Sequence, residues 1–245
     1  MGIHFSSQKV TDQPRICDPD EIFQSTSKWY EVSEEYWMSQ DNSINGMLGG
    51  FPELGPIDIE FSSKILKQYM LQFQTQNEVC ADVGSGIGRI SIELLSKHFQ
   101  SITLVEPINK FLKKAEIDLS KCNPNISIDS FCGGAQKWKI TKQYDCIWIQ
   151  WVIMFLTDKD SISFLQRCKK HLKPNGFIVI KDNFSVSEKT APRHFALYYP
   201  DDNSFSRTYQ HYVSLVQESG LELVETYLQP NWPEDMLPVY IFICK

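Results

Sequence analysis

The chain has 245 residues, 42% hydrophobic and 22% charged, which is ordinary for a globular protein of one large or two small domains. Its formal net charge is −6 and it has no dense run of lysine and arginine, which argues against a general nucleic-acid binder and suits a cationic partner. The seven cysteines and five histidines show no C-x-x-C or H-x-x-x-H spacing, so we expect neither a metal site nor a disulfide framework.

The first 27 residues are polar and lack hydrophobic periodicity, and we expect them to form a mobile leader. They begin Met-Gly-Ile-His-Phe-Ser, which fits the pattern for N-myristoylation at Gly2, although so short a pattern also matches by chance. The sequence contains neither a signal-peptide core nor an apolar run of transmembrane length. We therefore expect a monomer without stable membrane insertion, located in the cytoplasm, with the nucleus as an additional location.

Residues 28–73 have a helical pattern, interrupted by a loop rich in glycine and proline at residues 45–56, and we expect a helical cap. From residue 78 onward, strand-like runs alternate with helix-like runs, which is typical of a parallel sheet with crossover helices. The expected strands are residues 78–83, 101–106, 126–132, 144–151, 177–182, 221–228 and 239–244. The expected helices are residues 89–99, 109–120, 158–172 and 205–219.

Two features refine this prediction. The stretch Lys173-Pro-Asn-Gly176 is expected to end the helix before it, because proline and glycine both disfavour a helix. No helical stretch separates the last two strands, so they form a hairpin and place one antiparallel strand in the sheet. The sequence thus predicts a single α/β domain over residues 28–245, with a mostly parallel seven-stranded sheet.

A glycine-rich loop, Gly84-Ser-Gly-Ile-Gly-Arg89, follows the first strand of this sheet and opens a helix. Its glycines permit a tight turn and close approach of a ligand, and the helix N-terminus presents free N–H groups. Glu106 lies at the end of the next strand, where a carboxylate can accept hydrogen bonds from both hydroxyls of a ribose. Asp82 and Arg89 flank the loop and suit a zwitterionic ligand such as S-adenosylmethionine.

Alternatives to a cofactor loop remain open at this point. The loop could serve only to pack the strand on the helix, and Asp82 could pair with Arg89 without touching a ligand. The spacing G-x-G-x-G also differs from the G-x-G-x-x-G of dinucleotide binders. No tyrosine is followed by a lysine four residues later, so one common catalytic pair of nicotinamide dehydrogenases is missing.

Several stretches of the chain resemble the protein α-N-terminal methyltransferases, which are seven-stranded, Rossmann-like enzymes that depend on S-adenosylmethionine. The resemblance covers residues 30–183 well and the C-terminal part loosely. It implies a Rossmann-like fold, S-adenosylmethionine as cofactor and methylation of the α-amine of protein N-termini that begin X-Pro-Lys or X-Pro-Arg. The stretches that carry it are Tyr36-Trp37, Asn45-Gly-Met-Leu-Gly-Gly50, Ile57-Asp58, Gly84-Ser-Gly-Ile-Gly-Arg-Ile90, Ile147-Trp-Ile-Gln-Trp-Val-Ile153, Leu156-Thr-Asp158 and Ile178-Val-Ile-Lys-Asp-Asn183.

The resemblance also implies roles for individual residues. The cofactor would be bound by Gly84, Gly86, Arg89, Glu106, Gly134, Ala135 and Gln150. The substrate would be bound by Trp37, Leu48, Gly49, Trp151, Asn183 and Asp202. Of these, Asp202 would take a proton from the amine and Asn183 would orient it, while Trp37 or Trp151 would receive the methylated cation.

The chain departs from the family at three positions of this implied site. Phe155 stands where the family typically has a histidine, Tyr199 replaces an acid, and Leu237 replaces a tyrosine. These changes put the rate and the sequence preference in doubt more than the reaction class.

Less specific interpretations of the implied site also remain. Trp151 could be a core residue, Asn183 a strand cap and Asp202 a turn residue. Two other functions stay open, namely a small-molecule amine N-methyltransferase and a catalytically weakened module that binds N-terminal peptides.

Overall fold

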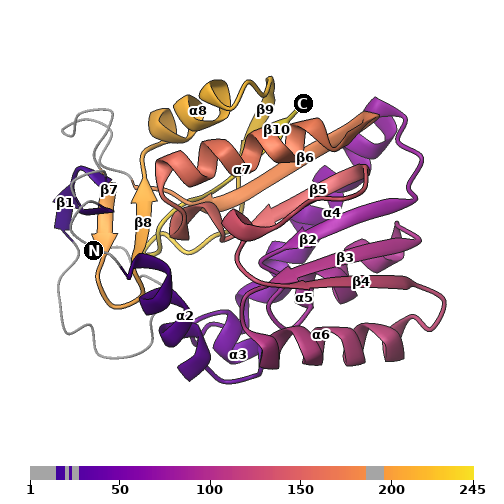
Figure 1. Ribbon diagram of the computed structural model, residues 1–245, viewed down its shortest axis with the longest axis horizontal. Coiled ribbons are helices and arrows are strands. Elements are labelled where there is room, and N and C mark those ends of the chain that lie inside the picture. Colours follow the sequence, from indigo (N-terminus) through magenta and orange to yellow (C-terminus); the bar gives the residue numbers. More distant parts are fainter. Residues whose placement is uncertain (1–14, 20–21, 24–27, 186–195) are drawn as a thin grey trace.

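A seven-stranded sheet with the strand order β4-β3-β2-β5-β6-β10-β9 forms the centre of the protein (Figure 1). The structure is a computed structural model that describes residues 15–19, 22–23, 28–185 and 196–245. The first five strands in this order are parallel, and β10 is antiparallel to both β6 and β9, which confirms the predicted fold class. The strands are β2 Val79–Val83, β3 Ser101–Glu106, β4 Ser127–Cys132, β5 Tyr144–Gln150, β6 Leu172–Asn183, β9 Leu223–Leu228 and β10 Val239–Cys244.

Helices cover both faces of this sheet, and alternate residues of each strand supply one or the other core (Figure 1). On β5, Trp148 belongs to the core beneath α4, α5 and α6, whereas Ile147 and Ile149 belong to the core beneath α7 and α8. Both faces of β5 are therefore buried, which explains its apolar run from Cys146 to Ile149. The helices are α4 Leu54–Phe73, α5 Arg89–Glu93, α6 Asn109–Cys122, α7 Asp158–Lys170 and α8 Tyr209–Glu218.

The helices α2 (Trp29–Ser39) and α3 (Ile44–Met47) precede α4 in the segment that was expected to form a helical cap. Trp37 of α2 and Met47 of α3 pack against a small apolar cluster formed by residues of the glycine loop and the start of α6. This packing holds α2 against the ends of β2 and β3. A wall of the functional site therefore comes from a part of the chain that precedes the sheet.

A second, three-stranded antiparallel sheet lies beside α2 (Figure 1). It consists of β1 (Arg15–Cys17), β7 (Ala196–Tyr199) and β8 (Ser204–Arg207). Phe205 of this sheet stacks on Trp29 of α2 with ring centroids 5.0 Å apart. The sequence did not predict this sheet. Part of the segment expected to be a leader, residues 1–27, therefore pairs with a strand far along the chain, while Gly2 lies outside the described residues.

Three predicted boundaries need correction. The helix expected from residue 205 begins at Tyr209, because the preceding residues pair with β7 and the Thr208 hydroxyl then caps the helix. Residues 89–99 form the short α5 followed by a 3-10 turn at Leu95–Lys97. Residues 173–176 belong to β6, where a shift in its pairing with β5 accommodates the proline.

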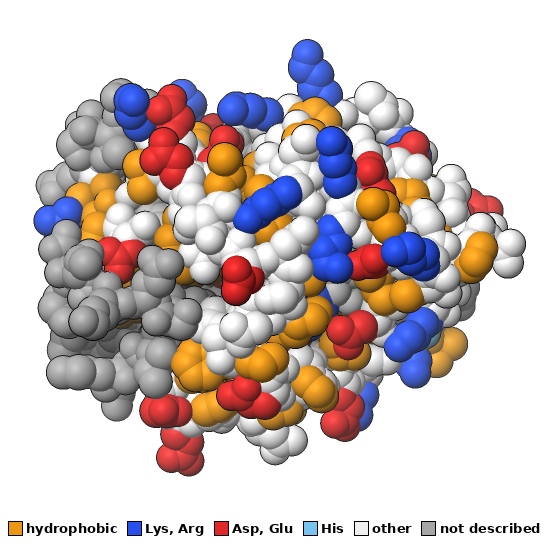
Figure 2. Space-filling model, turned by 90° about the horizontal axis from the view of Figure 1, so that it is seen from below, with side chains coloured by type: hydrophobic (Ala, Val, Ile, Leu, Met, Phe, Trp, Pro, Cys, Tyr) orange, Lys and Arg blue, Asp and Glu red, His pale blue; other side chains and the backbone are white. Residues whose placement is uncertain are grey.

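On the face shown in Figure 2, basic, acidic and apolar side chains are interspersed, without one large field of either sign. Within the described residues, no helix has the length and apolar character needed to span a membrane. The same part of the chain holds no group of three or more His, Cys, Asp or Glu side chains placed to bind a metal ion.

Candidate active site

A cavity lies at the carboxyl ends of β2, β3 and β5, where α/β sheets place their ligands. The glycine loop forms one wall and α2 forms the opposite one. All seven residues predicted to bind the cofactor line this cavity, together with two of those predicted to bind the substrate. These lining residues are Gly84, Gly86, Arg89, Glu106, Gly134, Ala135, Gln150, Trp37 and Trp151.

The glycine loop has a backbone that other residues adopt only with strain. Gly84 and Gly86 have φ angles of 73° and 53°, in the left-handed region. A Cβ atom on Gly84 would lie 2.3 Å from Cγ2 of Val152, so the loop and the chain after β5 are packed too closely for a side chain. The loop thus brings its backbone to the cavity wall, as a cofactor loop requires.

Glu106 closes the loop from the end of β3. Its two carboxylate oxygens accept hydrogen bonds from the backbone N–H groups of Gly86 and Ile108, both at 2.9 Å. Burial raises the pKa of Glu106 to about 7, although these two N–H donors oppose the shift. A carboxylate has about four acceptor sites, so about two remain for ligand hydroxyls. This geometry fits the predicted contact with a ribose.

Arg89 supplies the cationic group of the cavity. Its Nη2 atom forms an ion pair with Asp58 Oδ2 at 2.5 Å, whereas its Nη1 atom is buried and has no hydrogen-bond partner among the described residues. The neighbouring Ser85 hydroxyl also lines the cavity and is likewise buried without a partner in this part of the chain. Buried donors without partners are rare. Their presence here fits a ligand carboxylate.

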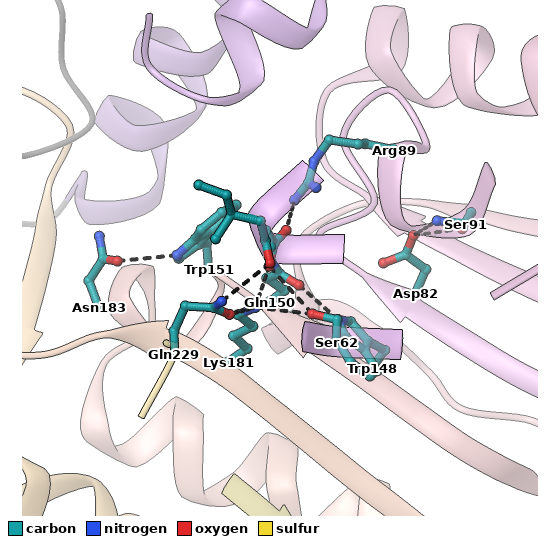
Figure 3. A network of polar contacts seen from close by, with 12 residues as sticks. Ser62, Asp82, Arg89, Ser91, Trp148, Gln150, Trp151, Lys181, Asn183 and Gln229 are labelled. Carbon is teal, nitrogen blue, oxygen red and sulfur yellow. Dashed lines mark hydrogen bonds and ion pairs between the residues drawn. The ribbon is translucent and has the colours of Figure 1, made fainter. Parts of the chain in front are cut away.

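Asp82 does not form the predicted alternative ion pair with Arg89. Its Oδ2 atom instead accepts hydrogen bonds from the backbone N–H and the hydroxyl of Ser91, at 3.1 and 2.6 Å (Figure 3). Burial raises the pKa of Asp82 to about 6, and the nearby Arg89 charge moderates this shift. The partner of Arg89 is Asp58, for which no role was predicted from the sequence.

Aromatic side chains line the part of the cavity nearest α2. The rings of Trp37 and Phe155 meet edge to face with centroids 6.0 Å apart. Trp151 has a φ angle of 53°, a strained conformation that is common at functional sites, and its indole N–H donates to Asn183 Oδ1 at 3.2 Å (Figure 3). Trp151 is therefore a wall residue of the cavity and not part of the core.

Helix α2 contributes three further residues to the cavity that were not predicted from the sequence. Tyr30, Ser33 and Glu34 line the cavity together with Trp37. The spacing i, i+3, i+4, i+7 places these four side chains on one helical face, and that spacing was the available signal. Glu34 brings a carboxylate to the aromatic part of the cavity, where no cation among the described residues forms an ion pair with it.

Four predicted substrate residues lie outside the cavity lining: Leu48, Gly49, Asn183 and Asp202. Leu48 is fully buried and Gly49 has a positive φ angle of 59°. Asp202 is also buried; its carboxylate accepts from the Ser204 hydroxyl and its carbonyl oxygen accepts from the Ser33 hydroxyl, both at 2.7 Å. Asp202 therefore contacts Ser33, a cavity residue of α2, without lining the cavity itself.

Comparison with known proteins agrees with the cofactor cavity that this geometry indicates. The sequence profile of the family described as "AdoMet dependent proline di-methyltransferase" matches residues 25–245. The chain belongs to this family. Its membership confirms the predicted resemblance and makes the protein a methyltransferase with S-adenosylmethionine as cofactor.

Named relatives agree with the family. The chain is 37% identical over 220 residues to alpha N-terminal protein methyltransferase 1 of Dictyostelium discoideum, covering 88% of this chain and 78% of the relative. It is 33% identical over 229 residues to N-terminal Xaa-Pro-Lys N-methyltransferase 1-A of Xenopus laevis, covering 92% and 99%. A solved structure of a SAM-dependent methyltransferase from Leishmania major superposes with a TM-score of 0.83 at 30% identity, covering 93% of this chain and 91% of that one.

Proposed function

We propose that this methyltransferase modifies the α-amino group of protein N-termini that begin X-Pro-Lys or X-Pro-Arg. The names of its relatives support an N-terminal protein substrate. The observation that carries the proposal is the division of the cavity, because the glycine loop and Glu106 form one part while aromatic rings and Glu34 form the other. The second part suits a cationic amine, which aromatic faces and carboxylates both attract.

The residues present fit the cofactor, whose sulfonium supplies the methyl group. Glu106 would hold the ribose, the loop around Gly134 the adenine, and Arg89 the carboxylate of the methionine end. The enzyme's main task is then positioning, because the amine lone pair must align with the methyl group for an in-line displacement.

The substrate amine must also lose a proton, since an α-amine has a pKa near 8 and is largely charged at neutral pH. Glu34 faces the cavity and can hold the ammonium group there. Asp202 contacts helix α2 through Ser33. Burial raises the pKa of Tyr36 on the same helix, and the charge of Asp202 adds to this shift. We assign Asp202 the final acceptance of the proton, through water, and Asn183 the positioning of Trp151.

Mass spectrometry tests the proposal. The protein is incubated with S-adenosylmethionine and a peptide beginning Ser-Pro-Lys, which should gain between one and three methyl groups. An N-acetylated copy should stay unmodified, and a Ser-Pro-Glu peptide should react more slowly than Ser-Pro-Lys or Ser-Pro-Arg. A peptide that binds without gaining mass would favour a peptide-binding module. If the peptides neither bind nor react while a small amine is methylated, the small-molecule alternative replaces the proposal.

Three further expectations belong to this proposal. We propose that the enzyme acts as a monomer in the cytoplasm and also in the nucleus, where protein N-termini are accessible. We propose no nucleic-acid partner, in keeping with the net charge of −6. Acylation at Gly2, if present, would give only marginal and reversible membrane attachment.

A further inference from the structure

A buried polar network lies directly beneath the cavity, and its members come from five separate segments of the chain. Its centre is Asp58 of α4, whose carboxylate binds Arg89, Lys181 of β6 and the side-chain amide of Gln150. Asp58 and Lys181 have no exposed surface, and the ammonium group of Lys181 does not reach the cavity wall. The side chains of Arg89, Gln150, Lys181 and Gln229 converge in Figure 3.

Lys181 is held as an ammonium ion by three acceptors. Its Nζ atom donates to Asp58 Oδ1, to the Ser62 hydroxyl at 3.0 Å and to Gln229 Oε1 at 2.7 Å. Three acceptors match the three N–H groups of an ammonium ion. Burial raises the pKa of Asp58, but Lys181 and Arg89 outweigh it and hold that pKa well below its ordinary value. A single carboxylate thus faces two buried cations, so the three side chains together carry one positive charge in excess.

This arrangement divides the carboxylate of Asp58 between its two cations. Lys181 takes Oδ1, and Arg89 reaches Oδ2 with Nη2 alone. Arginine and carboxylate otherwise prefer a bidentate pair, in which two N–H groups meet both oxygens. Lys181 holds Oδ1, which also accepts from the Gln150 amide at 3.1 Å and from the Ser62 hydroxyl at 3.4 Å. The second arm of Arg89 therefore has no free carboxylate oxygen of Asp58 to bind. Its buried Nη1 has no partner among the described residues, and Arg89 lines the cavity.

We propose that Lys181 is a positioning residue for the cofactor: by occupying Oδ1 of Asp58, it keeps Nη1 of Arg89 available for the carboxylate of the cofactor's methionine end. The ligand carboxylate then supplies the second negative charge, so that two anions face two cations. Gln150 is positioned by the same group, because its Nε2 atom donates to Asp58 and its Oε1 atom accepts from the Trp148 indole at 2.9 Å. The inference depends on the cofactor and not on the peptide substrate.

The test compares two ligands that differ only at the amino acid end. S-Adenosylhomocysteine carries this end, whereas 5′-methylthioadenosine has the same nucleoside and sulfur without it. In Lys181→Met, Arg89 should close onto both oxygens of Asp58. Calorimetry should then show S-adenosylhomocysteine binding weakened at least about tenfold, as expected for losing a hydrogen bond to a charged group. Binding of 5′-methylthioadenosine should change by less than about twofold.

A double variant, Asp58→Asn with Lys181→Met, removes the competing carboxylate as well. Arg89 is then free again, and S-adenosylhomocysteine affinity should recover to within about threefold of the wild-type value. Lys173→Met is the matched control, because it breaks the ion pair with Asp145 at the other end of β6. It should leave the affinities for both ligands unchanged.

Each outcome decides the inference. Unchanged S-adenosylhomocysteine binding in Lys181→Met would overturn it, and so would equal weakening of both ligands, which is the result of a merely structural role. If Lys181→Met does not fold, the double variant decides, because selective loss of S-adenosylhomocysteine binding there contradicts the competition for Asp58. Failure of the peptide assay with intact ligand binding would instead count against the proposed substrate.

Discussion

Replacing Gly84 by alanine should destabilise the protein, and the structure identifies the atom responsible. At a φ angle of 73°, a residue with a Cβ atom costs about 1–2 kcal/mol. The added Cβ would also lie 2.3 Å from Cγ2 of Val152, and such overpacking costs about 1–3 kcal/mol. We therefore expect Gly84→Ala to lower the free energy of unfolding by about 2–5 kcal/mol in urea denaturation.

A double-mutant cycle separates the two contributions. Val152→Ala removes the clashing methyl group, so the pair Gly84→Ala/Val152→Ala should be about 1–3 kcal/mol more stable than the sum of the single effects. Gly55→Ala is the control, because its Cβ would lie 3.4 Å from Leu48 Cδ1 in a helix, and it should be neutral or stabilising by up to about 1 kcal/mol. Additive effects at Gly84 and Val152 would refute the close packing of the glycine loop.

Three predictions concern the chemistry of the site. Asp202→Asn should lower turnover about a hundredfold or more with unchanged S-adenosylhomocysteine affinity, and an unchanged rate would remove Asp202 from the mechanism. Glu34→Gln should raise KM for a Ser-Pro-Lys peptide about two- to fivefold, whereas exposed Glu35→Gln should not. Because burial raises the pKa of Glu106 from 4.5 to about 7, this carboxyl group keeps its proton to a higher pH in the folded protein than in the unfolded chain. As the pH rises from about 4.5 to about 7, the stability of the unliganded protein should therefore fall, and S-adenosylhomocysteine should bind with release of a proton in calorimetry. Both effects should shrink in Glu106→Gln.

Much of the central sheet was predictable because its signals are local. A buried parallel strand gives an apolar run, a crossover helix gives a 3.6-residue period, and Gly84 and Glu106 occupy the ends of strands. The second sheet has no such signal, since β1 and β7 are short and pair Ile16 with Leu197 across most of the chain. Their pairing depends on the aromatic cluster around Trp29, which forms only in the folded protein.

The same distinction between local signals and long-range contacts applies to the candidate active site. Residues that reach the cavity from strand ends followed from the sequence and the resemblance. The network beneath Arg89 did not, because Asp58 comes from α4 and Lys181 comes from β6. Neither residue has a sequence pattern on its own helix or strand that indicates this contact. Contacts of this kind depend on the three-dimensional packing of segments, which periodicity does not record.

Phe155 is the clearest departure from the family, and the structure separates its side chain from the backbone that carries it. The 3-10 turn Ile153–Phe155 is fixed by groups outside it: Arg207 donates to the carbonyl oxygens of Ile153 and Leu156, and the Trp29 indole donates to that of Phe155 at 2.7 Å. None of these bonds involves the side chain at position 155. A change of residue there therefore alters the chemistry of the cavity while leaving the turn in place. With phenylalanine at this wall, we propose that proton acceptance falls to the carboxylates of Glu34 and Asp202, and their substitution therefore tests the mechanism most directly.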